Sequence, residues 1–421
     1  MKYEKIEKSN YNLYIIRSKK FKTIKVKLLY KRPIKKEEIT IRNFLNDILI
    51  NSSEEYKTSR EIEMQTQELY DFGIGSQSFK SGNYHVISYN ANFLNEKYTE
   101  PGMINKSLEF MLSLIYKPNV KNNKFDNTYF KIIKRAIEES IDSEKDNPDR
   151  YSVLKLDEML DSKTLSYKAV GYKDDLKKIT PSNLYDYYKS VLENDRLDIF
   201  IVGDIKDNIV EIFDEYIPKR PNKKYEIKHY LDIDKLKYKE KSEKQNISQS
   251  KLALGYKTEN LSFFELHYVL MIYALILGGS PDSKLFKNVR EKNSLCYYIN
   301  ASANTISKTL YITAGINKKN YDKTVKLIKE QVSEMNNVTE AELNKAKKSF
   351  INGCREIFDG EGSIINAFVS KEYLNTDLPK ERIKKINKVT INDIKKLNKK
   401  INLDSIFFLE GTLKNEDSED W

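Results

Sequence analysis

Asn43, Asn46 and Asp47 are polar residues in the segment TIRNFLNDILINSS, residues 40–53. The apolar residues of this segment recur at helical spacing and predict a helix with one buried face. The three polar residues, at positions i, i+3 and i+4, then lie on neighbouring turns of a second face, an arrangement that can hold a metal ion. None of them is a histidine or a glutamate, the residue types that bind zinc from a helix. The cluster is therefore either a solvated helix face or a hard-cation site with Asp47 as an oxygen ligand.

The composition predicts a globular protein of more than one domain. A chain of 421 residues is too long for one ordinary core, and 39% hydrophobic residues supply enough apolar material for two or three. The net charge of +11 arises from lysines that alternate with acids, as in KKEE and EKSEKQ. Such mixing is typical of a solvated surface and disfavours nucleic-acid binding, which needs clustered arginine and stacking aromatic residues.

Cysteine usage and hydropathy indicate a cytoplasmic protein. The two cysteines, Cys296 and Cys354, are too far apart for a metal knuckle or a redox motif, so we expect a reducing compartment. The first residues lack the apolar core of a secretory signal. The longest apolar run, residues 268–277, is about half the length that a membrane span requires. We expect no membrane segment, and a frayed acidic tail at 416–421.

The two halves of the chain show the same order of predicted elements. In both halves a strand is followed by an amphipathic helix, a polar turn, further helices and strands, and finally a short helix before an apolar strand. The closing strands DIFIVGDI and SIFFLEGTL lie about 210 residues apart, a spacing that suits duplicated domains. Residues 218–245 are charged, carry two prolines and predict a linker. We therefore expect α+β domains at 1–217 and 246–421, each a mostly antiparallel sheet with helices on one face.

The most specific stretch is LGGSPDSKLFKNVREKNSLCYY, residues 277–298. It resembles the second-domain motif of the insulinase/pitrilysin family of zinc peptidases, in which a glycine turn leads to a helix ending in Val-Arg-Glu-Lys and then to a Leu-x-Tyr strand. Gly-Tyr at 171–172, Tyr-Tyr at 187–188 and Val-Gly-Asp at 202–204 extend the resemblance to the first half. Details such as GNYHVIS look closest to a non-catalytic branch from Gram-positive bacteria, linked with aminopentanol modification of elongation factor P.

The resemblance implies that the zinc site of the family is degenerate in this chain. Active members carry His-x-x-Glu-His on the helix that corresponds to residues 40–53, and those three positions fall on Asn43, Asn46 and Asp47. A further glutamate ligand is expected near Ser140, where Glu138 and Glu139 are close. An amide is a poor zinc ligand and Asn46 cannot act as a general base. We therefore expect no catalytic residue, no metal and no cofactor in this chain.

The resemblance also assigns a role to Arg290 and Tyr297. In the family an arginine and a tyrosine at this seven-residue spacing reach towards the substrate carbonyl near zinc, where a permanent positive fork and a neutral hydroxyl suit a developing oxyanion. The alternative is that Arg290 pairs with a nearby acid while Tyr297 packs under the sheet.

The resemblance implies a partner as well, because related two-domain chains work in pairs that enclose a chamber. We expect a heterodimer with a zinc-containing homologue, in which this chain shapes the chamber, binds an extended peptide by strand addition and contributes Arg290 and Tyr297. The alternative function is a non-proteolytic scaffold that binds a peptide or protein, with a link to elongation factor P modification that the resemblance implies. Neither function involves nucleic acid or a membrane.

Overall fold

The structure is a computed structural model that describes residues 2–160, 163–205, 209–225, 228–231 and 235–413. It divides into two compact units, which are described separately. The first consists of residues 1–144, 168–229 and 358–372, and the second of residues 145–167, 230–357 and 373–421. The acidic tail at 416–421 lies outside the described residues.

The first unit contains a six-stranded sheet with the strand order β1-β2-β8-β3-β5-β4. All neighbouring strands are antiparallel except β2 and β8, which run parallel. The strands of this sheet are β1 (Lys2–Glu7), β2 (Asn12–Arg17), β3 (Thr23–Pro33), β4 (Gly73–Ser81), β5 (Tyr84–Leu94) and β8 (Arg196–Gly203). A separate two-stranded ribbon consists of β6 (Val120–Lys121) and β7 (Lys124–Phe125).

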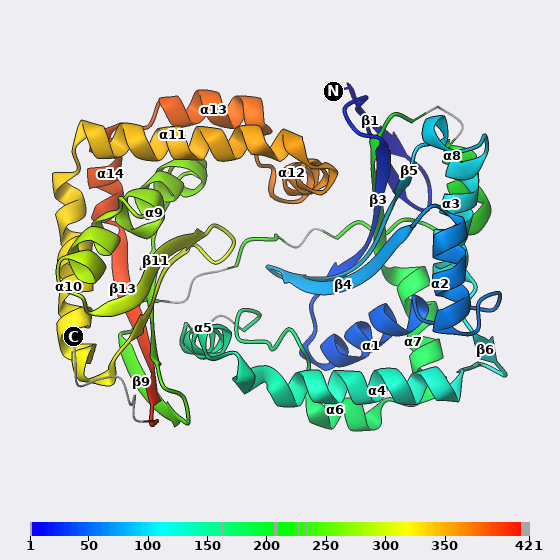
Figure 1. Cartoon of the computed structure of the whole chain (residues 1–421), viewed down its shortest axis with the longest axis horizontal. Coiled ribbons are helices and arrows are strands. Elements are labelled where there is room, and N and C mark those ends of the chain that lie inside the picture. Colours follow the sequence, from blue (N-terminus) through cyan, green and yellow to red (C-terminus); the bar gives the residue numbers. More distant parts are fainter. Residues whose placement is uncertain (1, 161–162, 206–208, 226–227, 232–234, 414–421) are drawn as a thin grey trace. The chain divides into compact units, whose positions relative to one another are not determined.

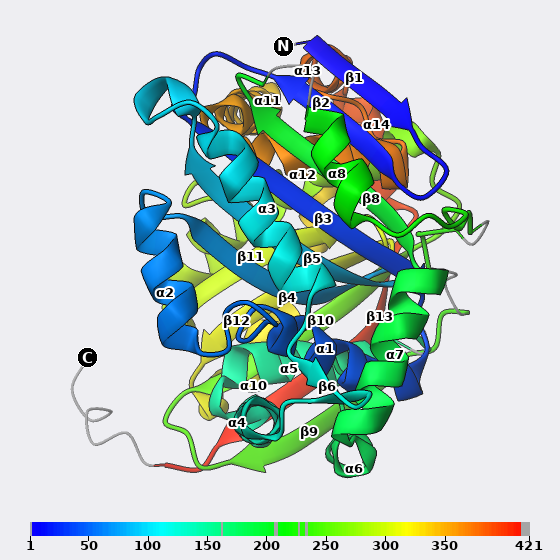
Figure 2. The ribbon, with the colours of Figure 1, turned by 90° about the vertical axis from the view of Figure 1, so that its right-hand side faces the viewer.

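Most helices of the first unit cover one face of its sheet, where the main core lies. Figures 1 and 2 show α3 and α8 along this side of the strands. Alternate residues of β3, such as Val26, Leu28 and Tyr30, enter this core because successive strand side chains point to opposite faces. The helices are α1 (Ile39–Leu49), α2 (Ser59–Glu68), α3 (Met103–Tyr116), α4 (Asn127–Asp142), α6 (Lys173–Lys178), α7 (Pro181–Asn194), α8 (Ile209–Tyr216) and α12 (Glu361–Leu374).

The second unit contains a five-stranded sheet with the order β11-β12-β10-β13-β9. Only the β13–β9 pair is parallel. The strands are β9 (Lys239–Gln245), β10 (Ser250–Thr258), β11 (Cys296–Asn304), β12 (Thr309–Ile316) and β13 (Ile401–Gly411). The helices are α5 (Pro148–Met159), η4 (Glu265–Val269), α9 (Leu270–Gly278), η5 (Phe286–Glu291), α10 (Tyr321–Ser333), α11 (Glu340–Glu356), α13 (Pro379–Asn387) and α14 (Ile391–Asn398).

The two sheets have the same topology. The order β2-β8-β3-β5-β4 in one corresponds to β9-β13-β10-β12-β11 in the other, and in both the first pair is parallel and the others antiparallel. Strand β1 is an addition at one edge of the first sheet. The predicted α+β class with two similar, mostly antiparallel halves is therefore confirmed. The segment predicted as a linker, 218–245, includes strand β9 at its end.

One helix of each half packs on the sheet of the other half. Helix α12 belongs to the first unit, where Phe368 stacks on Tyr3 of β1 with ring centroids 4.7 Å apart. Helix α5 belongs to the second unit, where Leu156 packs with Phe407 of β13 and Tyr311 of β12. Both helices lie on the sheet face opposite to the main core. Because of this exchange of α5 and α12, the two units are not the continuous segments 1–217 and 246–421.

Among the described residues, no helix combines the length and the apolar character that crossing a bilayer would need.

Candidate functional site

Helix α1 places the predicted cluster against the edge strand β4 of the first unit. The side chain of Asn43 is buried and both of its polar groups are used. Its Nδ2 donates to the carbonyl oxygen of Ala169 (2.8 Å), and its Oδ1 accepts from Ser78 Oγ of β4 (2.5 Å). Asn43 therefore ties α1 to the sheet and to the segment before α6, and at this residue the helix face is packed.

Asn46 and Asp47 complete the cluster. Asn46 Nδ2 donates to Asp47 Oδ1 (3.0 Å), while Asn46 Oδ1 is buried without a hydrogen-bond partner among the described residues. Burial raises the pKa of Asp47, and hydrogen bonds from Asn46 and Ser76 only partly oppose this effect. A carboxyl group whose charged form is disfavoured is a weak cation ligand. Two amides and such a carboxyl do not fit zinc, so these three residues do not form a zinc centre.

The acids that were expected to supply a further ligand are held by cations near the surface of α4. Glu138 forms an ion pair with Lys173 (3.2 Å), and Glu139 forms one with Arg135 (2.8 Å). Ser140 is exposed. Within the part of the chain that the structure describes, no group of three or more His, Cys, Asp or Glu residues could hold a metal ion.

A buried charge network that the sequence analysis did not identify fixes α1 in place. Arg42, adjacent to Asn43, is only 1% exposed and donates from Nη2 to Asp195 Oδ2 (2.8 Å). The other oxygen of Asp195 accepts from Arg32 Nε of β3 (2.5 Å), and Arg32 also reaches Glu38 (3.1 Å). One carboxylate thus links the helix, the central strand β3 and the residue that precedes β8.

His85 completes this network as a neutral acceptor. Its Nδ1 accepts from Arg42 Nε (2.8 Å), an arrangement that requires the unprotonated nitrogen. Burial, together with the nearby positive charge of Arg42, lowers the pKa of His85 well below its usual range. His85 is therefore a structural residue that supports α1 from strand β5.

Arg290 and Tyr297 lie in the second unit at two irregular backbone positions. Arg290 is on η5, a π-helical turn, and its guanidinium packs on the ring of Phe286 with the carbon 4.6 Å from the ring centroid. Tyr297 is the extra residue of a bulge in β11, where the register with β12 shifts between Cys296 and Tyr298. π-Turns and bulges are frequent at functional sites because they re-aim individual side chains.

Both side chains are accessible. Arg290 is exposed and makes no ion pair with any residue in the described ranges. Tyr297 is 56% exposed, on a strand that forms the edge of its sheet. Burial raises the pKa of the Cys296 thiol to about 11, and the positive charge of Arg290 opposes this shift because it favours the thiolate. The alternative, in which Arg290 pairs with an acid and Tyr297 packs under the sheet, does not describe these side chains.

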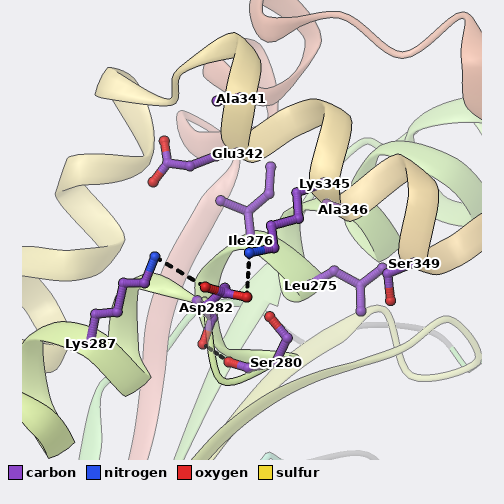
Figure 3. A pocket seen from close by; sticks show the side chains of 11 residues that line it. Leu275, Ile276, Ser280, Asp282, Lys287, Ala341, Glu342, Lys345, Ala346 and Ser349 are labelled. Atoms are coloured by element: carbon purple, nitrogen blue, oxygen red, sulfur yellow. Dashed lines mark hydrogen bonds and ion pairs between the residues drawn. The ribbon is translucent and has the colours of Figure 1, made fainter.

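The glycine turn before η5 is held by close packing and by ion pairs. At Gly278 an added Cβ would come within 2.5 Å of the backbone nitrogen of Ala301, so only glycine lets α9 approach β11 this closely. After the turn, Asp282 pairs with Lys287 (3.4 Å) and with Lys345 of α11. Figure 3 shows these contacts across a cavity of about 380 Å³ between the turn and α11. This packing fixes the position of the helix that carries Arg290.

Comparisons with known proteins agree with this description. Residues 178–350 match the family model described as the peptidase M16 inactive domain. A Bacillus subtilis protein named "Probable inactive metalloprotease YmfF" is 29% identical over 407 residues, 95% of both chains. A conserved protein from Enterococcus faecalis of known structure is 26% identical, with a TM-score of 0.89 over 98% of this chain and 100% of that one. A peptidase M16 inactive domain from Pseudomonas fluorescens (16% identical, TM-score 0.80 over 99% and 100%) shares the fold.

Proposed function

We propose that this chain is a non-catalytic subunit of a heterodimeric peptidase. It is a homologue of the insulinase/pitrilysin (M16) peptidases, and the residues at its own zinc positions do not fit the metal. A zinc-bearing homologue supplies the hydrolytic centre. This chain contributes the Arg290 guanidinium and the Tyr297 hydroxyl to the partner's site and helps to hold the substrate. We assign these two residues to the partner's site because residues 277–298 resemble the segment that, in active members of the family, places an arginine and a tyrosine near zinc.

The exposure of Arg290 and Tyr297 is the observation that carries this proposal. An arginine without an ion-pair partner among the described residues and a half-exposed tyrosine contribute little to the stability of their own unit. Placed on a π-turn and a bulge, they present one cationic donor and one neutral hydroxyl to whatever lies outside the edge of the sheet. Such donors suit an oxyanion that forms in a partner's active site.

The substrate class that we propose is an extended peptide. Among the described strands, β4 and β11 lie at sheet edges, and an edge strand can pair with an added strand through its backbone groups. Strand β4 also contacts the α1 cluster through Ser76 and Ser78. The added strand must be extended along its length, so peptides and unfolded segments are the substrate class that we propose.

The test is to reconstitute this chain with a zinc-bearing homologue from the same organism and to measure cleavage of unstructured peptides. We expect neither chain alone to match the activity of the pair, and chelation of zinc to abolish it. Arg290→Ala should lower kcat/KM at least tenfold, since loss of an oxyanion donor typically costs a factor of about 100 to 1000 in kcat. Tyr297→Phe should have a smaller effect of the same kind.

Matched controls distinguish a site role from a loss of folding or of assembly. Arg355→Ala removes another exposed arginine of the second unit, and Tyr98→Phe removes another exposed tyrosine hydroxyl. Both controls should leave cleavage unchanged, and all four variants should assemble equally well in gel filtration. Chelator-sensitive cleavage by the isolated chain would refute the subunit role, and full activity of Arg290→Ala in an intact complex would refute the site role.

The exposed edge strands also support a second candidate, a scaffold that binds a peptide or protein without cleaving anything. The two functions differ in partner choice. A scaffold would bind extended peptides on its own with the same affinity whether or not a zinc-bearing homologue is present, and it would not form a stable complex with that homologue. The role in modification of elongation factor P that the resemblance implies belongs to this candidate and is tested by direct binding to the enzymes concerned.

A further inference from the structure

The turn between β1 and β2 forms one wall of a cavity of about 460 Å³ in the first unit. Figure 2 shows these two strands at the edge of the sheet, next to β8. Residues 221–224 form a second wall, and they are fixed in place by Asn222. Its backbone N–H donates to Ser9 O (2.5 Å), and its side chain makes two hydrogen bonds with the backbone of Leu197 (2.9 and 3.1 Å). The cavity is therefore built from anchored segments.

The lining of this cavity is strongly cationic. It contains one carboxylate, Glu7, and five cations, which are Lys5, Lys8, Arg196, Lys223 and Lys224. A cavity of this size falls in the range of small-molecule sites.

Three of the five cations have acidic partners in the described structure. Lys5 pairs with Glu7 (2.5 Å), Lys8 with Asp214 (2.8 Å) and Arg196 with Asp198 (2.9 Å). Lys223 and Lys224 have no ion-pair partner within the described residues and are both exposed. The cavity thus has an excess of two positive charges on adjacent residues of one wall.

The pKa of Glu7 shows that the electrostatic potential in this cavity is positive. Its pKa is lowered chiefly by a hydrogen bond and the charge of Lys5, with further contributions from Lys224 and Arg196. These last two residues belong to other walls, so their positive charges act across the cavity. The same charges stabilise any other anion that enters it, and the Ser9 side chain adds a hydroxyl to the lining.

We propose that this cavity, which we call the hairpin pocket, binds a small phosphorylated ligand with at least two negative charges. The size of the pocket and its local excess of two charges fit one phosphate-bearing molecule. A nucleic acid would instead require cations that follow its backbone for several nucleotides, with aromatic residues between them. The site belongs to the first unit, whereas Arg290 and Tyr297 belong to the second, and it does not depend on the subunit role proposed above.

The test uses the full chain and inorganic pyrophosphate as the probe, with binding measured by isothermal titration calorimetry at low salt. Lys223→Ala/Lys224→Ala should weaken binding at least tenfold. Lys395→Ala/Lys396→Ala, which removes an adjacent pair of exposed lysines from α14, should change it less than about twofold, so that net charge alone is controlled. Glu7→Gln should tighten binding several-fold because it removes the lining carboxylate and frees Lys5.

The result that supports the proposal is saturable binding with this ranking of variants, together with an unchanged melting temperature of the Lys223/Lys224 variant. Three results would overturn it. These are no binding of pyrophosphate at low salt, equal weakening by both lysine pairs, and tighter binding of a single-stranded oligonucleotide or a poly-glutamate peptide that is lost in the Lys223/Lys224 variant. The last would identify the pocket as part of a polymer-binding surface.

Discussion

Asp195→Asn should destabilise the first unit more than any other single change in its charge network. Asp195 is fully buried and accepts from both Arg32 and Arg42. The substitution keeps the shape of the side chain and removes its charge. Arg32 retains Glu38 at 3.1 Å, whereas Arg42 loses its one carboxylate partner among the described residues. The variant therefore leaves a buried guanidinium on α1 without a counter-charge.

The expected magnitude follows from the burial of this pair. Removal of one partner from a buried ion pair costs about 3–5 kcal/mol, because the remaining charge stays desolvated. For a unit of this size, about 1 kcal/mol corresponds to roughly 2–4 °C, so the transition of the first unit should fall by about 6–20 °C. Differential scanning calorimetry at neutral pH measures this shift, and the transition of the second unit is an internal reference.

The matched control is the same substitution at Asp47, a carboxyl on α1, the helix that Asp195 anchors through Arg42. Burial penalises the charged form of Asp47 and raises its pKa, so Asp47→Asn, which removes this charge, should leave the melting temperature unchanged or raise it. A double variant, Arg42→Met/Asp195→Leu, should be more stable than Asp195→Asn because it buries no unpaired charge. A shift below about 2 °C for Asp195→Asn, or an equal loss for Asp47→Asn, would refute the reasoning.

Three further predictions concern other parts of the structure. Burial lowers the pKa of all three histidines, two of them to about 4, so the unfolded chain takes up protons first. Stability should be fully present above about pH 6.5 and fall between pH 6.5 and 4, as melting curves across this range would show; a flat profile would contradict it. Gly278→Ala should cost about 1–3 kcal/mol in denaturant unfolding because its Cβ would overlap Ala301, and a wild-type midpoint would contradict the packing described here. Phe368→Ala should cost about 3–5 kcal/mol and destabilise the first unit, although residue 368 lies in the second half of the chain; a shift confined to the second unit would show that α12 packs elsewhere.

The elements with strong periodicity could be predicted from the sequence. The apolar spacing of residues 40–53 predicted helix α1, and the alternation of residues 83–93 predicted strand β5. Strands β4 and β9 were not predicted. Their sequences, GIGSQSFKS and KEKSEKQ, are polar because both strands are edges with much of their surface exposed, so neither shows an apolar pattern.

The contacts that define the candidate site could be predicted only in part. Residue types alone indicated that Asn43, Asn46 and Asp47 do not suit zinc. The ion pair between Arg42 and Asp195 joins residues 153 positions apart in the sequence, and no local sequence pattern predicts such a pair. The only signal was an arginine beside the apolar face of a helix. The π-turn at Arg290 and the bulge at Tyr297 depend on register within the folded sheet, which hydropathy does not encode.

The exchange of α5 and α12 has a consequence for the origin of this architecture. A single ancestral half, expressed by itself, would leave one sheet face without its covering helix and one helix without a sheet. In a pair of such halves, the helix of each copy would cover the sheet of the other copy, which is the geometry of a domain-swapped homodimer. Fusion of two such genes would keep the exchanged packing within one polypeptide. Each half could then diverge in its edge strands, but neither could complete its fold without the helix of the other.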